Sequence, residues 1–271
     1  NPWGFSKEDR LKWVDGTDFK PPTLEEKNEV DILYWVGCAG SYDPRNQNIA
    51  INMLKILESA KIDYAVLGKE ETCTGDSARR LGEEYLFETL AKQNIKTMNK
   101  YKFKKVVASC PHCMHTILNE YPDFGGNYEV IHHTELIDEL IATGQLKTNN
   151  KLDKTITFHD PCYLGRHNKI FDQPRNILEN VTNIENIIEM KENKESSMCC
   201  GAGGGNMWHE INEGSRINVE RFNQAVETGA ETVATACSFC TIMMDDAMKV
   251  TGKENLMEVK DIAEIVGDSI D

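Results

Sequence analysis

The sequence has no long apolar run, no excess of basic residues and no apolar stretch at its start. No run approaches the roughly 18 residues that a membrane-spanning helix needs, and nothing at the start resembles a secretion signal. Its 44 acidic residues outnumber its 30 basic residues, and the net charge of −14 repels a phosphate backbone. These absences argue against a membrane-spanning chain, a secreted protein and a nucleic-acid-binding protein.

The composition is that of a globular chain whose 271 residues suffice for one large domain or two smaller ones. It begins at Asn1 rather than Met, so we expect a fragment or a processed product of a longer protein. Residues 1–30 carry several prolines and little periodicity, which predicts an extended N-terminal arm laid over a neighbouring surface. The alternative is a floppy linker. The expected anchors of the arm are Trp3, Phe5 and Trp13.

Short apolar runs alternate with amphipathic stretches along the chain. The strand-like run DILYWVGC (31–38) precedes the helical pattern NIAINMLKILESA (48–60). A second strand-like run, DYAVLG (63–68), comes next. This order of strand, helix and strand is typical of a parallel sheet covered by helices.

The same order repeats after a polar stretch at about 145–154, which predicts a boundary between one domain at 31–148 and another at 149–271. In the second half KTITFHDPC corresponds to DILYWVGC, and four cysteine landmarks recur at offsets of 124 to 127 residues. Such regular spacing indicates an internal duplication. We therefore predict an α/β fold of two duplicated halves, each a small parallel sheet flanked by helices, related by a pseudo-twofold axis.

All nine cysteines belong to this repeat. The first half has two single cysteines and a C-x-x-C pair, namely Cys38, Cys73, Cys110 and Cys113. The second half has an adjacent pair at the middle position, so its cysteines are Cys162, Cys199, Cys200, Cys237 and Cys240. In each half the first cysteine and the C-x-x-C follow predicted strands. We expect these thiols at the carboxyl edge of the sheet, where open α/β sheets bind their ligands.

Several kinds of thiol site compete to explain this set. Structural disulfides are disfavoured, because nothing marks the chain as secreted and five thiols cannot all pair within one half. Zinc takes four ligands and usually draws them from two C-x-x-C hooks, whereas each half has one. A redox C-x-x-C needs no further cysteines. An iron-sulfur cluster takes thiolates from separate loops, so a cluster with an extra ligand uses all five thiols.

A glycine-rich loop follows the adjacent cysteines, in the sequence SMCCGAGGGNMWHE. Glycines let the backbone approach a bound group and direct N–H donors at its sulfides, as in an anion-binding nest. Those donors would also raise the reduction potential of a cluster. The alternative is a tight turn before a helix. The glycines concerned are Gly201, Gly203, Gly204 and Gly205.

These motifs resemble those of the CCG-domain family, which includes the B and D subunits of heterodisulfide reductase. Related members are iron-sulfur subunits of glycolate, glycerol-3-phosphate and lactate oxidation systems. The family motif is a cysteine, a gap, Cys-Cys-Gly, a second gap and C-x-x-C, usually present twice. The second half matches it in full from Cys162 to Cys240, whereas in the first half Thr74 replaces the second adjacent cysteine.

The resemblance covers about residues 31 to 265 and implies a noncubane four-iron four-sulfur (4Fe-4S) cluster in the second half. For the first half it leaves a conventional 4Fe-4S cluster, a zinc ion or an empty relic open. The chain is thus expected to be an iron-sulfur electron-transfer module of a heterodisulfide-reductase-like oxidoreductase. Two alternatives stay open: a reductase subunit that cleaves a substrate disulfide at the cluster, and a non-catalytic zinc-binding scaffold.

The similarity is greatest to long membrane-associated iron-sulfur oxidoreductases, in which this region follows a ferredoxin-like domain and a haem-bearing membrane segment. The implied partners are a ferredoxin-like domain or subunit, electron-transferring flavoprotein or a dehydrogenase, and a quinone-reactive membrane subunit. The implied location is the cytoplasm, at the inner face of the membrane through a portion that precedes Asn1 or through a partner.

Polar side chains flank the cysteine loops. Some could relay a proton or donate to a cluster sulfide, although packing is the commoner role for such residues; they are His112, His159, His167, His209 and Trp208. Three arginines could offset the negative charge of a cluster, hold a carboxylate or simply face solvent; they are Arg79, Arg80 and Arg166.

Overall fold

The computed structural model describes residues 1–148, 151–209 and 214–270. Contacts divide the chain into two compact units, Asn1–Leu136 and Ile137–Asp271. Each unit contains one parallel sheet flanked by helices, which confirms the predicted α/β fold. The pseudo-twofold axis stays a prediction, and so do the domain limits, because their boundary at residue 149 lies outside the described residues.

Four parallel strands form the sheet of the first unit, in the order β2-β1-β3-β4. Their bounds are β1 Glu29–Trp35, β2 Tyr64–Ala65, β3 Lys102–Ala108 and β4 Val130–His132. The last residues of the two central strands pair directly, Trp35 with Ala108. The loops that leave β1 and β3 therefore start side by side, at the carboxyl edge of the sheet.

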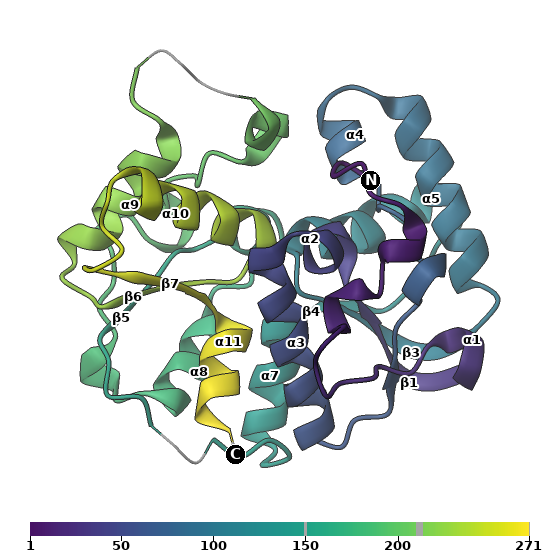
Figure 1. The fold of residues 1–271 in the computed structure, drawn as a ribbon, viewed down its shortest axis with the longest axis horizontal. Helices are drawn as coiled ribbons and strands as arrows, with labels where there is room; N and C mark the ends of the chain where they lie inside the picture. The colour runs from purple at the N-terminus through teal and green to yellow at the C-terminus, as the bar shows by residue number, and fades with distance from the viewer. Residues whose placement is uncertain (149–150, 210–213, 271) are drawn as a thin grey trace. The chain divides into compact units, whose positions relative to one another are not determined.

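Helices flank this sheet, and in Figure 1 its strands lie between α3 and α5. The α-helices are α1 Leu24–Lys27, α2 Gly37–Tyr42, α3 Pro44–Ser59, α4 Asp76–Arg80, α5 Glu84–Met98, α6 Pro111–His115 and α7 His133–Ala142, the last of which crosses the division between the units. A π-helix spans Thr116–Glu120, and 3-10 turns span Gly68–Glu70 and Tyr121–Phe124. The start of α3 follows from its sequence, because Asp43 accepts a hydrogen bond from the Asn46 N–H at 3.0 Å and Pro44 occupies the first turn.

The first thirty residues, expected as an extended arm, contain two 3-10 turns, Lys7–Asp9 and Lys12–Val14, before α1. Trp13 is buried, whereas Phe5 is exposed and stacks on the ring of Tyr42. Arg10 is buried as well, which is unusual for a charged side chain. The segment packs against its own unit and places the Arg10 guanidinium in the interior of that unit.

Three parallel strands form the sheet of the second unit, in the order β5-β6-β7. They are β5 Ile156–Phe158, β6 Thr232–Thr235 and β7 Glu258–Asp261. In Figure 1 the sheet lies between α9 and α10 on one face and α8 and α11 on the other. The helices are α8 Asp172–Val181, α9 Ile217–Glu227, α10 Ser238–Val250 and α11 Ile262–Ser269, with a π-helix at Tyr163–His167 and 3-10 turns at Ile184–Asn186, Lys194–Ser196 and Gly203–Trp208.

The last strand of each unit passes directly into a helix through the same local device. In the first unit the Glu135 carboxylate accepts from the His132 N–H at 2.9 Å. In the second, the Glu264 carboxylate accepts from the Asp261 N–H at 2.8 Å and completes a capping box. The shared device supports the duplication.

No helix in the described part of the chain is long and apolar enough to cross a membrane.

A buried ion pair fixes the loop between β5 and Cys162. The Arg175 guanidinium donates to both Asp160 oxygens, at 2.8 and 2.9 Å, and Asp160 also accepts from the Lys194 N–H at 2.7 Å. Asp160 is only 3% exposed. Because a buried bidentate ion pair between arginine and a carboxylate is strong, this contact holds the start of the loop in one position.

We expect Asp160→Ala to lower the free energy of unfolding by about 3 kcal/mol, the low end for a broken buried pair, because Glu189 still contacts Arg175. Urea denaturation of the metal-free chain measures it. The matched control is Lys169→Ala, which removes an exposed pair with Glu195 and should cost at most about 1 kcal/mol. Equal effects of the two substitutions would contradict this assignment.

Candidate metal centre

Three of the five cysteines of the second unit follow neighbouring strands, and the other two lie on a separate loop. Cys162 follows β5, and Cys237 follows β6 and caps the N-terminus of α10. Cys240 lies in the first turn of that helix. The C-x-x-C motif thus begins at the N-cap residue and ends inside the helix. The adjacent pair, Cys199 and Cys200, lies on the loop that precedes the 3-10 turn Gly203–Trp208.

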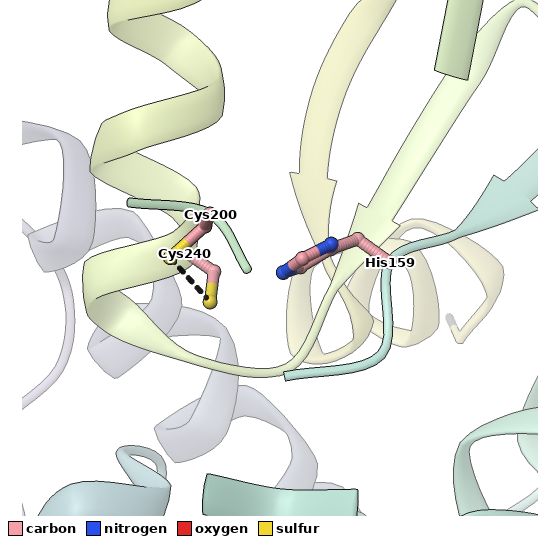
Figure 2. A group of neighbouring side chains, drawn as sticks. All are labelled: His159, Cys200 and Cys240. Atoms are coloured by element: carbon pink, nitrogen blue, oxygen red, sulfur yellow. Dashed lines mark hydrogen bonds between the residues drawn. The ribbon is translucent and has the colours of Figure 1, made fainter. Parts of the chain in front are cut away.

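The five thiols of this unit form one connected group. The Cys240 thiol donates to the Cys200 sulfur at 3.2 Å, as Figure 2 shows, and Cys240 is also hydrogen-bonded to Cys237. Cys199 accepts hydrogen bonds from Cys162 and from Cys200. None of the nine cysteines, all of which are described, is in a disulfide. The sequence-predicted set therefore converges on one place, with its sulfurs reduced.

The crowding of these sulfurs changes their acidity. Hydrogen bonds to Cys200 and Cys237, together with burial, raise the pKa of Cys240 far above its ordinary value. The hydrogen bond to Cys199 and burial likewise raise the pKa of Cys162. Hydrogen bonds from Cys162 and Cys200 lower the pKa of Cys199 strongly. Buried sulfurs this close cannot all ionise unless a cation offsets their charge.

The glycine loop directs backbone donors at this group. The Gly201 N–H donates to the Cys199 sulfur at 3.3 Å, and the N–H groups of Ala202 and Gly203 also reach the adjacent pair. Gly201 has φ 91°, and Gly204 and Gly205 also have positive φ. Residues other than glycine rarely adopt such values. The loop has the donors and backbone geometry of an anion-binding nest.

His159 joins the group from the end of β5. Its ring and the sulfurs of Cys200 and Cys240 present ligand atoms that all lie within 4.8 Å of one another. Among the described residues this is the one set of three potential metal ligands that lie so close. Figure 2 shows one edge of the imidazole turned toward the two cysteines.

A buried arginine supports this imidazole. The Arg221 Nε donates to His159 Nδ1 at 3.0 Å, and Arg221 is fully buried. Burial and the charge of Arg221 lower the pKa of His159 to about 3, so the ring is neutral. Sequence reasoning named His159 but missed Arg221, because α9 reads as an amphipathic helix whose buried cation leaves no signature in the pattern.

The four cysteines of the first unit form a second group. Cys38 accepts a hydrogen bond from Cys73, and Cys113 is hydrogen-bonded to Cys110. The charges of Cys38 and Cys73 also raise the pKa of Cys113, after its hydrogen bond to Cys110 and burial. Thr74 occupies the place of a fifth sulfur, because its hydroxyl donates to the Cys113 sulfur at 3.8 Å.

The backbone beside this group repeats that of the second unit. The Gly75 N–H donates to the Cys73 sulfur at 3.4 Å, and Gly75 has φ 91°, the value of Gly201. A Cβ on Gly75 would lie 2.8 Å from a ring carbon of Phe87, so the position excludes larger residues. The two units therefore share this local backbone geometry but differ at its central residue, which is Thr74 in the first unit and Cys200 in the second.

An ion pair absent from the sequence-based predictions adjoins the first group. The Arg10 guanidinium lies 3.5 and 3.7 Å from the Cys38 sulfur and pairs with Glu71. Glu71 in turn accepts from the Val36 and Gly37 N–H groups, at 3.2 and 2.9 Å. The hydrogen bond from Cys73 and the charge of Arg10 lower the pKa of Cys38 to about 6. No spacing rule links these two residues to the cysteines.

The other flanking residues have partners of their own. His112 Nδ1 lies 3.0 Å from Asp76, and Arg80 contacts Asp76 at 3.0 Å. Arg79 lies 3.3 Å from Glu120, which also pairs with Arg80. These two arginines thus hold protein carboxylates, one of the roles that the sequence leaves open.

In the second unit the remaining candidates lie around the cysteine loops. His167 stacks on Tyr163, and Arg166 donates to the Ser197 carbonyl. His209 lines a pocket of about 170 Å³ that Gly201 also borders. Trp208 is 37% exposed.

The donor set fits a metal centre that prefers sulfur ligands. Thiolate sulfur suits zinc and iron-sulfur clusters alike, but five sulfurs exceed the four ligands of a structural zinc site. Backbone N–H groups directed at sulfur match the way proteins hold anionic clusters. Arg221 is a buried cation beside this group, and it interacts electrostatically with Asp160 and Glu192 as well as with Cys240 and Cys200.

Comparison with known proteins agrees with these observations. The chain is 42% identical to a probable iron-sulfur-binding oxidoreductase FadF of Bacillus subtilis, over all of this chain and 39% of that protein. It is 41% identical to an EtfAB:quinone oxidoreductase of Syntrophomonas wolfei, over 98% of this chain and 38% of that protein. It thus spans about two fifths of the length of these relatives.

A third relative is the D subunit of the dihydromethanophenazine:CoB–CoM heterodisulfide reductase of Methanosarcina barkeri. It is 32% identical over all of this chain and 65% of that relative. The family model described as the cysteine-rich CCG domain matches residues 32–118 and 156–245, one copy in each unit. The chain belongs to the family of cysteine-rich CCG-domain proteins.

Proposed function

We propose that this chain is the iron-sulfur electron-transfer module of a heterodisulfide-reductase-like oxidoreductase. The observation that carries the proposal is the connected group of five reduced sulfurs in the second unit. A noncubane 4Fe-4S cluster there would use all five, and such a group supplies one-electron transfer when bound. The proposed ligands are Cys162, Cys199, Cys200, Cys237 and Cys240.

The residues around the sulfurs would hold the cluster and adjust its potential. The N–H groups of Gly201, Ala202 and Gly203 donate to cysteine sulfur and would favour the reduced, more negative state. Burial of Cys200, Cys237 and Cys240 keeps water away from that side of the group. The chain thus provides the binding and the electrostatics, while the cluster would carry the electron.

The proposed partners follow from what relatives are named. One relative is an EtfAB:quinone oxidoreductase and another a probable membrane-anchored ferredoxin of Chromohalobacter salexigens, 38% identical over all of this chain. We propose electron-transferring flavoprotein or a dehydrogenase as donor, a ferredoxin-like domain or subunit as neighbour, and a quinone-reactive membrane subunit as acceptor. The proposed location is the inner face of the membrane.

The first unit is proposed to bind a second metal group through Cys38, Cys73, Cys110 and Cys113. Four thiolates suffice for a conventional 4Fe-4S cluster or a zinc ion. Arg10 would offset part of the negative charge of either, because its guanidinium lies 3.5 Å from the Cys38 sulfur.

We expect the anaerobically reconstituted chain to bind iron and acid-labile sulfide. Replacement of a second-unit ligand, Cys200→Ser or Cys240→Ser, should abolish the paramagnetic signal of that unit, because each removes a soft sulfur from the connected group. Elemental analysis and electron paramagnetic resonance measure this.

The matched control is Cys113→Ser, a C-x-x-C substitution in the first unit, which should leave the second-unit signal unchanged. Zinc without iron or sulfide in the wild-type chain would instead favour the zinc-scaffold alternative. Either a signal that survives Cys240→Ser or one that vanishes in Cys113→Ser would contradict the assignment to the second unit.

We expect Thr74→Cys to complete the first group and raise the iron and sulfide content of the chain. Thr74 is 2% exposed, and its hydroxyl, whose place the new sulfur would take, is directed at the Cys113 sulfur. The paramagnetic spectrum should then show a second component like that of the second unit. A spectrum and an iron content equal to those of the wild type would show that five thiols at this geometry do not suffice.

The 32% identity to the D subunit of a heterodisulfide reductase keeps disulfide cleavage as a second candidate. Cleavage takes two electrons, and one cluster delivers them one at a time. We therefore expect the reduced chain to release no thiol from small disulfides, in an assay with a thiol reagent under anaerobic conditions. Stoichiometric thiol release that stops in Cys200→Ser would favour the reductase.

A further inference from the structure

We infer that His159 is a hydrogen-bond donor to the sulfurs of the second-unit group, locked in one tautomer by Arg221, and is not a metal ligand. The role toward a cluster rests on the proposed function, whereas the tautomer does not. The cysteine motif includes neither His159 nor Arg221.

The first contact fixes the proton of the imidazole. Arg221 Nε lies 3.0 Å from His159 Nδ1. A guanidinium has donors and no acceptor, so Nδ1 must present its lone pair. The neutral ring then carries its one proton on Nε2. Arg221 thereby selects the tautomer without any change of charge on the ring.

The second set of contacts makes Arg221 unable to turn away. Its Nη1 donates to the Glu192 carbonyl at 2.9 Å and to Gln224 at 2.6 Å, and its Nη2 donates to the Ser197 hydroxyl at 3.1 Å. With the bond from Nε to His159, four of the five N–H donors of this fully buried side chain are hydrogen-bonded. The guanidinium is thus held from several directions, and Nε points at the imidazole.

The third observation is that the Nε2 proton has no acceptor of its own. His159 is 1% exposed, and its Nε2 is buried without a hydrogen-bond partner. The ring edge away from the backbone faces Cys200 and Cys240 in Figure 2, with ligand atoms within 4.8 Å. A buried donor without an acceptor destabilises the fold, so an acceptor is expected in front of it.

Sulfur of a bound cluster or of its thiolates would be that acceptor. A hydrogen bond to cluster sulfur favours the more negative, reduced state and raises the reduction potential. Metal ligation by His159 is disfavoured for the same reasons, since Nδ1 is occupied by Arg221 and Nε2 carries the proton. The set of His159, Cys200 and Cys240 is therefore not a zinc site with two cysteines and a histidine.

The tautomer can be measured in the metal-free full chain. Two-bond proton–nitrogen correlation spectra of ¹⁵N-histidine-labelled protein should show His159 with its proton on Nε2. Arg221→Met should turn this into a mixture of tautomers. If Arg221→Met does not fold, the wild-type spectrum decides: a proton on Nδ1 or a doubly protonated ring overturns the inference.

The role toward sulfur can be measured in the reconstituted chain by redox titration monitored with paramagnetic resonance. His159→Leu, which removes the donor, should shift the midpoint potential to more negative values. His159→Gln, whose side-chain N–H group can reach the place of Nε2, should restore most of the shift. An unchanged potential in His159→Leu, or nitrogen hyperfine coupling that marks a histidine ligand, overturns the inference.

These outcomes separate the inference from the proposed function. If the wild-type chain takes up no iron and sulfide, the proposed function fails and the donor role toward a cluster fails with it. If the cluster forms but the potential does not respond to His159, the proposed function stands and only this inference fails.

Discussion

In both units, cysteines that follow neighbouring parallel strands are brought together with cysteines on a separate loop. β5 pairs with β6 and β1 pairs with β3, so the loops that follow these strands start side by side in each unit. Thiols on those loops therefore lie close together, and such closely packed, partly buried thiols need a cation nearby to ionise together. The sheets thus serve to hold sulfur in place.

Duplication explains why the two cysteine groups share the same backbone geometry. They differ in the number of sulfurs. Gly75 and Gly201 have the same φ of 91° and donate to equivalent sulfurs, Cys73 and Cys199. The next position is Thr74 in one unit and Cys200 in the other, so a hydroxyl stands where a sulfur completes the second group. The cations differ too, because Arg10 reaches its group from the N-terminal segment and Arg221 from a helix.

Much of this arrangement was predictable from the sequence, because spacing determines it. The recurrence of cysteines after strand-like runs indicated two parallel sheets and placed both thiol groups, as did the Cys-Cys-Gly motif. The contacts of Arg10, Glu71 and Arg221 were not predictable, since they depend on side chains that fold back from distant segments. Nor did the sequence show that Arg79 and Arg80 pair with carboxylates of their own unit.

The sulfurs of the second unit are proposed to bind iron. Diffraction data collected at the iron absorption edge from anaerobically reconstituted crystals can locate the metal atoms. We expect anomalous density for several iron atoms within bonding distance of Cys162, Cys199, Cys200, Cys237 and Cys240. The absence of iron density at these cysteines, or iron bound away from them, would contradict this proposal.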